Sequence, residues 1–476
     1  MMAKVSGFVQ DLVEQHRLFG SKEAFTLFHS KVANQIHHSL FSIGSEHLEH
    51  LDNAIVETNW ANITWDEDFS VIIPTLNAGP RFEHCLSSIK AQINVGRIEI
   101  IIVDSGSTDK TVEIAKKMNV RLIQIDKSDF SHSQARNLGA EQAKYQNLFF
   151  TVQDAFIPHT NWLFKLCSIL HQNQLSAVST VEKAGEQASL YSKFAAYGHQ
   201  KFMGAVDKDR LMTMPNSTNP ALMRQNSNLS NIACLIHKQV FDEYKFRGSY
   251  GEDVDLGLRL IKDKKKLGLV SSLKINHFHE RPLLHHLKRS YADAYFLTKT
   301  FKNECNFPHS NLSDLLEECF YCWSINLHLN NDNSLNLSHS ESSTEFSRRF
   351  FSLLHHYSQV IDHQNVHLPV KTGKDLQEIN QFFLKINIST LTANKSIKRP
   401  GQILIGIKNH LMEVCKFIHS SESQEDDFKI KAFIDCVNKV FTDHIGQAIG
   451  EWVADHEQSI ESEKFNDLHF FLSKNI

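Results

Sequence analysis

The stretches FSVIIPTLN (residues 69–77) and IVDSGSTD (residues 102–109) decide the fold of this chain. Each begins with a run of β-branched and apolar residues, which predicts a buried strand. Each ends in small polar residues, which predict a turn where the strand stops. The segment between them has helical spacing, and this alternation is typical of βαβ units in a mostly parallel sheet.

The same alternation continues along the chain. It predicts strands at 69–75, 98–103, 120–125 and 148–152, and helices at 81–92, 110–118 and 133–144. Farther along it predicts a strand at 231–236, a helix at 253–262 and a strand at 273–277. Nearly everything from residue 283 on has helical period, and the stretch 326–343, rich in Asn, Ser and His, is expected to be a linker.

These patterns divide the chain into three parts. Residues 1–66 are expected to form an N-terminal helical segment, and residues 67–282 an α/β domain with a mostly parallel sheet flanked by helices. Residues 283–476 are expected to form a C-terminal helical region.

Composition narrows the classes of function. The formal net charge of -4 gives no positive field for nucleic acid, so we expect no nucleic-acid partner. The eight cysteines include one CxxC pair, in an apolar helical run, and are expected to be reduced structural thiols. With no leader pattern and no unbroken apolar run of spanning length, we expect a cytoplasmic protein with no transmembrane segment and only peripheral contact with the inner membrane.

Parallel sheets bind ligands at the carboxyl ends of their strands, so the residues just after each strand are the first candidates. Thr75 and Asn77 follow the first strand. Asp104 follows the second, where its carboxylate can accept a hydrogen bond from a nucleobase N–H or a ribose hydroxyl, and Ser105 begins a tight turn. A plain strand-turn-helix cap explains residues 107–109 equally well.

Two further candidates follow the same logic. Arg136 lies near the start of a helix, where a guanidinium can meet a phosphate or a base, although a surface arginine is the simpler interpretation. Gln153 and Asp154 end a strand, and one carboxylate at that edge can hold a divalent cation while a diphosphate and water complete the shell. A lone Asp after a strand is usually a turn residue.

The run GEDVDLGLRL (residues 251–260) places Glu252, Asp253 and Asp255 at a helix start. Carboxylates this close raise at least one pKa, which suits a general base near neutral pH. The alternative is acidic decoration of a helix N-terminus, which the helix dipole favours. Downstream, His277 and His279 lie on one side of an expected strand, with a spacing that suits a metal or a phosphate but also arises by chance.

Taken in order, these motifs resemble glycosyltransferase family 2, the inverting GT-A enzymes, and especially its rhamnosyltransferase-like branch. The resemblance covers a little under half of the chain and rests on IIPTLNAG, VDSGSTD, F-x-H-x-x-x-R-N, QDA-x-x-P, the Glu252-Asp253 pair and the final H-x-H. Two positions depart from the pattern: Val152 stands where the family has the first Asp of DxD, and Ser133 where it has Gly.

The resemblance implies a role for each candidate. Thr75, Asn77, Asp104, Ser105, Arg136 and Gln153 would bind the nucleotide donor. Asp154 and His277 would hold a divalent metal, Mg²⁺ or Mn²⁺, and Asp253, beside Glu252, would deprotonate the acceptor hydroxyl. His279 and Asp255 would contact the diphosphate or the acceptor.

The sequence therefore predicts a hexosyltransferase that moves a sugar from a nucleotide-diphosphate donor to a glycan or lipid-linked acceptor, in polysaccharide or envelope glycan assembly. The alternative is a catalytically weak nucleotide-sugar-binding scaffold protein, which Val152 favours and the Glu252-Asp253 pair disfavours. A nucleotidyltransferase would need a Gly-rich basic loop after the first strand, which the sequence lacks there.

Overall fold

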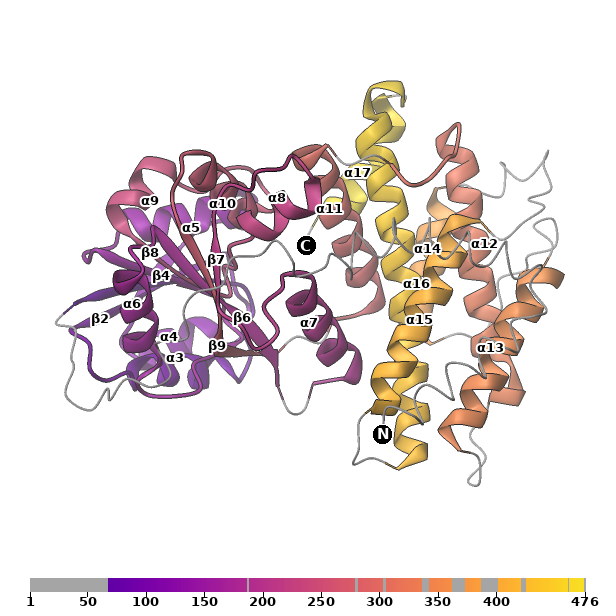
Figure 1. The fold of residues 1–476 in the computed structure, drawn as a ribbon, viewed down its shortest axis with the longest axis horizontal. Helices are drawn as coiled ribbons and strands as arrows, with labels where there is room; N and C mark the ends of the chain where they lie inside the picture. The colour runs from indigo at the N-terminus through magenta and orange to yellow at the C-terminus, as the bar shows by residue number, and fades with distance from the viewer. Residues whose placement is uncertain are drawn as a thin grey trace. The chain divides into compact units, whose positions relative to one another are not determined.

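The computed structural model describes residues 67–185, 188–278, 281–302, 305–335, 342–361, 373–386, 401–420, 425–460 and 462–474. The helical segment expected at 1–66 lies outside the described residues. The chain divides after residue 280 into two compact units, an α/β unit and a helical unit, each of which is described by itself (Figure 1).

A nine-stranded sheet forms the centre of the α/β unit, in the order β3-β2-β1-β4-β8-β6-β9-β5 with β7 beside β9. Parallel pairing links β1 to β2 and β4, β2 to β3, and β6 to β9. Of the described strands, β8, β5 and β7 run against the other six. The expected mostly parallel sheet is therefore confirmed. The strands are β1 (Phe69–Thr75), β2 (Ile98–Asp104), β3 (Arg121–Gln124), β4 (Asn147–Thr151), β5 (Ala155–Phe156), β6 (Ala177–Ala184), β7 (Arg210–Met212), β8 (Ala233–His237) and β9 (Leu267–His277).

The helices of this unit cover both faces of the sheet because the central strands are apolar on both sides. Alternate residues of β1, such as Val71 and Ile73, pack with α3, α4 and α6. On the other face α5 lies so close that a Cβ on Gly139 would fall 2.5 Å from Ile72. The helices are α3 (Phe82–Lys90), α4 (Thr111–Lys117), α5 (His132–Glu141), α6 (Trp162–Gln172), α7 (Leu190–Phe202), α8 (Pro220–Ser227), α9 (Lys238–Tyr244) and α10 (Glu252–Lys262).

The helical unit is arranged around one long helix, α16, which packs against α11, α12, α13 and α15. Gly446 and Gly450 let α16 approach α11 closely, since a Cβ at either position would come within 2.3 Å of a carbonyl oxygen of α11. The expected C-terminal helical region is confirmed. Its helices are α11 (Leu283–Phe301), α12 (Leu312–Asn331), α13 (Ser343–Val360), α14 (Lys374–Lys385), α15 (Gln402–Ser420), α16 (Asp426–His456) and α17 (Ser462–Ser473).

The linker expected at 326–343 is wrong at its first residues, because α12 continues to Asn331. Asn326 is fully buried, and its side-chain N–H₂ donates to Asn438 on α16 at 2.8 Å. Asn330 donates to the same oxygen at 2.8 Å. These amides therefore bond to one another between two helices, whereas their composition alone suggested a solvated loop.

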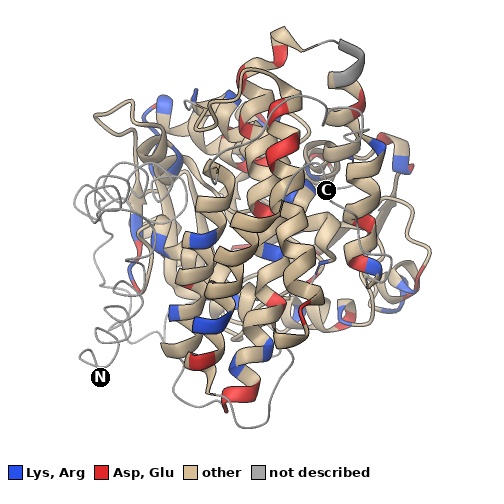
Figure 2. Ribbon diagram, turned by 90° about the vertical axis from the view of Figure 1, so that its right-hand side faces the viewer, with Lys and Arg blue, Asp and Glu red and all other residues tan. Residues whose placement is uncertain are grey.

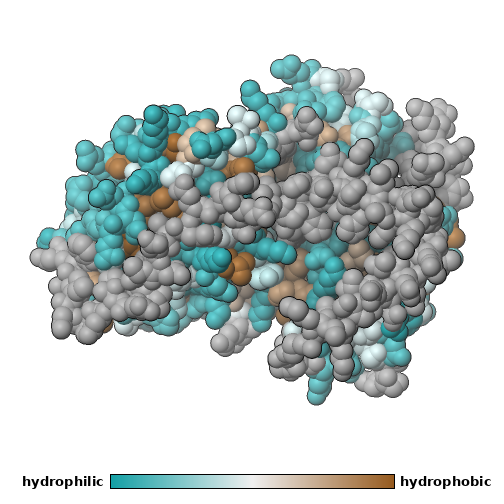
Figure 3. All heavy atoms as spheres, in the orientation of Figure 1, coloured by the Kyte–Doolittle hydropathy of each residue, from teal (hydrophilic) through white to brown (hydrophobic). Residues whose placement is uncertain are grey.

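Charged and hydrophobic residues are both scattered over the described part of the chain. In Figure 2, acidic and basic residues are interspersed along the helices. The visible described surface in Figure 3 is mostly hydrophilic, with hydrophobic residues in small groups. Among the described residues, no helix combines the length and apolarity needed to cross a membrane.

Candidate active site

Chain topology brings the candidate residues to one edge of the sheet. Thr75 and Asp104 end neighbouring parallel strands and lie side by side in the register of β1 and β2. Because β8 is antiparallel to β4, with Ala233 opposite Thr151, the residues just before β8 lie at this same edge. The carboxyl end of β9 arrives there too, since His277 pairs with Ala155.

The first group at this edge is a loop organised by Asp104, whose side chain is fully buried. One carboxylate oxygen accepts from the hydroxyls of Thr75, at 3.0 Å, and Ser107, at 2.5 Å. The other accepts from the backbone N–H groups of Gly106 and Ser107. Four donors occupy the usual acceptor capacity of a carboxylate, so a nucleoside would have to replace one of them.

Neighbouring side chains hold the loop after β1 in place. Asn77, at a positive φ of 48°, accepts the N–H of Thr108 at 2.8 Å through its side-chain oxygen. The Gln153 amide bonds both backbone groups of Leu76, at 2.9 and 3.2 Å. The Ser105 hydroxyl donates to the Thr75 carbonyl at 3.0 Å. Five of the six sequence-predicted donor residues, Thr75, Asn77, Asp104, Ser105 and Gln153, thus lie in connected loops after β1, β2 and β4. Their contact with a nucleotide stays a prediction.

Asp154 and His277 lie together as the metal-site prediction requires. His277 Nε2 is 3.3 Å from Asp154 Oδ1, and His277 Nδ1 is 2.6 Å from Glu182 Oε2 on β6. Burial alone would lower the pKa of His277, but hydrogen bonds to Asp154 and Glu182 raise it to about 10. Without a metal, His277 is therefore a cation held between two carboxylates.

The donor set fits one divalent cation. Ligands at about 2.1 Å on adjacent corners of an octahedron are about 3 Å apart, close to the Asp154–His277 separation. Glu182 binds the opposite ring nitrogen and so would orient the imidazole, as carboxylates commonly do for metal-bound histidines. Val152 contributes no donor side chain, so water and diphosphate oxygens would fill the remaining positions.

The third group of side chains in the site is a buried ion pair at the start of α10. Arg136 Nη1 lies 2.9 Å from Glu252 Oε1, and both side chains are almost fully buried. Asn231 Nδ2 donates to the same oxygen at 2.9 Å. Burial alone would raise the pKa of Glu252, but the Arg136 cation holds it below its usual value. Glu252 is therefore an anion committed to internal partners.

Asp253 has no such ion pair with Arg136, and its pKa moves in the opposite direction. The residue is partly exposed, and its carboxylate accepts from the backbone N–H groups of Val254, at 2.9 Å, and Asn231, at 3.3 Å. Burial, followed by the negative charge of Glu252, raises the pKa of Asp253 to about 6. A carboxylate that is ionised at neutral pH but unusually basic is suited to take a proton from a hydroxyl.

The remaining sequence-predicted site residues are Asp255, Arg136 and His279. Asp255 forms an ion pair with Arg259 at 2.8 Å along the same helix. Arg136 faces Glu252, and its Nε is buried with no hydrogen-bond partner among the described residues. His279 lies outside the described residues.

Sequence reasoning missed two residues of the site, Glu182 and Asn231. Glu182 stands within a strand whose run the sequence did not reveal, and Asn231 looked like the first residue of β8. The side-chain oxygen of Asn231 is buried and bonded to none of the described residues. The one signal for Glu182 was an acidic residue inside a β-branched run, STVEKA.

Comparison with known proteins finds glycosyltransferases. Residues 70–243 match the family model described as glycosyl transferase family 2. The O-antigen chain rhamnosyltransferase WbaN of Salmonella anatum is 24% identical over 246 residues, which cover 50% of this chain and 73% of that protein. Glycosyltransferase AglE of Haloferax volcanii is 31% identical over 136 residues, or 26% of this chain and 44% of that one.

A solved structure is also similar. The mannosyltransferase PcManGT from Pyrobaculum calidifontis, in complex with GDP-Man and Mn²⁺, superposes with a TM-score of 0.36 at 16% identity. The match covers 52% of this chain and 69% of that one.

The α/β unit and the family match define the class of protein: the chain is a glycosyltransferase. More narrowly, residues 70–243 match glycosyl transferase family 2, and the similarity of the chain to O-antigen rhamnosyltransferases agrees with the branch expected from its motifs.

Proposed function

We propose that this glycosyltransferase transfers a sugar from a nucleotide-diphosphate donor to an acceptor hydroxyl by one inverting displacement. Asp253 carries the proposal, because this partly exposed residue has a pKa of about 6 and lies at the sheet edge that also carries Asp154 and His277. A single displacement needs one base and a stabilised leaving group, and these residues supply both roles.

In this proposal Asp253 takes the proton of the acceptor hydroxyl at its carboxylate while the oxygen attacks the anomeric carbon. Glu252 stays ionised against Arg136, and its negative charge adds to the effect of burial in raising the pKa of Asp253. Asn231 holds both carboxylates, one through its side chain and one through its backbone N–H.

At the leaving-group side, Asp154 and His277 would hold Mg²⁺ or Mn²⁺, which when bound neutralises the charge that develops on the departing nucleoside diphosphate. The loops of Asp104, Asn77 and Gln153 would bind the nucleoside, and Arg136 would reach the donor through the N–H groups that Glu252 leaves free. Asp255 and His279 would contact the diphosphate or the acceptor.

We take a rhamnosyl donor as the first to test, because two relatives are named O-antigen chain rhamnosyltransferases. Those names also support a role in envelope polysaccharide assembly on a glycan or lipid-linked acceptor. Such work at the cytoplasmic face would need only peripheral membrane contact.

A donor panel of UDP-, GDP- and dTDP-sugars tests the proposal in two stages. First, a true donor with Mn²⁺ raises the melting temperature by mass action. Second, that donor is turned over by the wild type, and Asp253→Asn abolishes turnover without removing the melting shift. A donor that binds but is never transferred or hydrolysed would instead identify a nucleotide-sugar-binding scaffold.

A further inference from the structure

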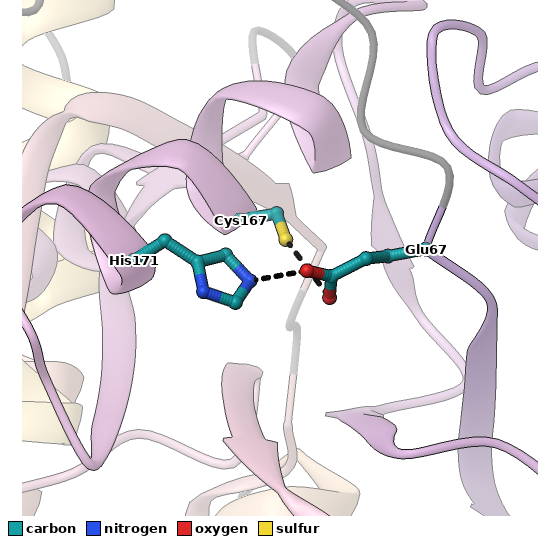
Figure 4. A group of neighbouring side chains, drawn as sticks. All are labelled: Glu67, Cys167 and His171. Atoms are coloured by element: carbon teal, nitrogen blue, oxygen red, sulfur yellow. Dashed lines mark hydrogen bonds and ion pairs between the residues drawn. The ribbon is translucent and has the colours of Figure 1, made fainter.

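A second group of potential metal ligands lies at the opposite edge of the sheet: Glu67, Cys167 and His171 (Figure 4). Glu67 comes two residues before β1, so it lies at the end where the parallel strands begin. Cys167 and His171 are one turn apart on α6, and their side chains therefore point the same way. This edge is remote from the carboxyl ends that carry Asp154 and Asp253.

Distances within the group suit a single ion. One ligand atom from each residue lies within 4.8 Å of the other two. His171 Nε2 is 2.8 Å from Glu67 Oε1, and Cys167 Sγ is 3.9 Å from Glu67 Oε2. Zinc bonds of about 2.0–2.3 Å place tetrahedral ligand atoms about 3.3–3.8 Å apart. Small side-chain rotations would bring these atoms onto one face of that tetrahedron.

Two neighbours extend the group. The Asn147 side chain donates to Glu67 Oε2 at 2.6 Å and so fixes the carboxylate, as outer-shell partners of metal ligands do. His237, paired with Asn147 in the register of β4 and β8, has its ring centroid 5.2 Å from that of His171.

The chemistry of the donors selects the ion. Mg²⁺ and Ca²⁺ prefer oxygen ligands, whereas a mixed sulfur, nitrogen and oxygen set is typical of zinc. Cys167 is fully buried, and its thiol donates to Glu67 Oε2 at 3.9 Å. Only a thiophilic cation that replaces the thiol proton can use this sulfur. The alternative is an ordinary Glu67–His171 ion pair, in which the thiol only packs in the core and donates a long hydrogen bond to Glu67.

We propose that Glu67, Cys167 and His171, with His237 as the fourth donor, form a structural zinc site that ties α6 to the chain entering β1. A four-ligand site of this kind is closed and has no position for substrate. Its effect would be on stability, because an ion that binds only the folded chain raises the free energy of unfolding.

Cobalt is the probe that tests the proposal on the whole, metal-stripped chain. One equivalent of Co²⁺ is expected to give a thiolate-to-cobalt charge-transfer band in the near ultraviolet, which the oxygen and imidazole ligands of Asp154 and His277 cannot produce. Cys167→Ser is expected to lose the band. Cys436→Ser, at a buried thiol in the helical unit, is the matched control and keeps it.

His171→Gln guards against a variant that merely fails to fold, since this side chain is partly exposed. It is expected to weaken Co²⁺ binding at least by the roughly 10- to 100-fold that loss of an outer-shell partner costs. Zn²⁺ should raise the melting temperature of the wild type and of Cys436→Ser, but not of His171→Gln. The absence of a charge-transfer band in the wild type, or its survival in Cys167→Ser, would overturn the proposal, and neither result bears on catalysis.

Discussion

The buried Arg136–Glu252 ion pair offers a test with two variants. Both remove the same contact, but they should shift the pKa of Asp253 in opposite directions. Glu252→Gln removes a negative charge beside Asp253 and leaves the Arg136 cation, so the pKa of Asp253 should fall. Arg136→Gln removes the cation that holds this pKa down and leaves the Glu252 anion, so the pKa should rise. Each variant loses the 2.9 Å ion pair, and each should lose about 3–5 kcal/mol of stability.

The size of the shift follows from the structure. The pKa of Asp253 rises from 3.8 to about 6. Burial is the larger cause, and the negative charge of Glu252 is the second. We therefore expect each variant to move the pKa by roughly 0.5 to 1 unit, or about 0.7 to 1.4 kcal/mol of interaction between the two charges. Asp253 works as a base only when ionised, so the rate should rise as pH rises through this pKa.

The assay is nucleoside diphosphate release from the identified donor, measured as kcat/KM from pH 5 to 8. The acidic limb should lie near pH 6 in the wild type, lower in Glu252→Gln and higher in Arg136→Gln. Glu141→Gln breaks an exposed ion pair between α5 and Lys245 and is the control that leaves the limb unmoved. Limbs that move in the same direction, or not at all, would refute Asp253 as the titrating base.

Three further predictions follow from single contacts. Glu182→Gln should weaken Mn²⁺ activation by about 10- to 100-fold, because it removes the carboxylate on His277 Nδ1; an unchanged Mn²⁺ dependence in activity titrations would exclude this outer-shell role. Asn231→Ala should cost about 1–3 kcal/mol in urea unfolding, since Glu252 loses a buried donor, and a loss below about 0.5 kcal/mol would contradict the contact. Gly446→Ala should destabilise the helical unit by about 1–3 kcal/mol, because the new Cβ would meet the Leu287 carbonyl at 2.2 Å. Gly373→Ala meets nothing within 4 Å and should change the melting temperature far less.

The sequence predicted accurately the strands whose carboxyl ends carry the proposed donor-binding residues. The strand expected at 69–75 is β1 itself, and that at 98–103 ends one residue short of β2. These runs are apolar on both faces and stop at turn residues. The residues of each run are therefore enough to predict the strand, without knowledge of its partners. The helix at 253–262 was equally visible, since three acids precede an amphipathic pattern.

The strand expected at 273–277 illustrates where local signals fail. The structure extends β9 back to Leu267, through the small residues Gly268, Ser271 and Ser272. Pairing with β6 and β7 stabilises this half of the strand, and those partners are far away in the sequence. Strand propensity depends on such neighbours more than on the residues themselves.

By itself the sequence determined which residue types stand at the carboxyl ends of the strands, because strand, turn and helix starts are set by neighbours along the chain. Only the tertiary structure decided what those residues do. Glu252 and Asp253 are adjacent carboxylates, yet Arg136, 116 residues earlier, neutralises one and leaves the other basic. In the same way Glu182 reaches His277 across 95 residues. A pKa depends on burial and on charges within a few ångströms, and folding alone brings those charges together.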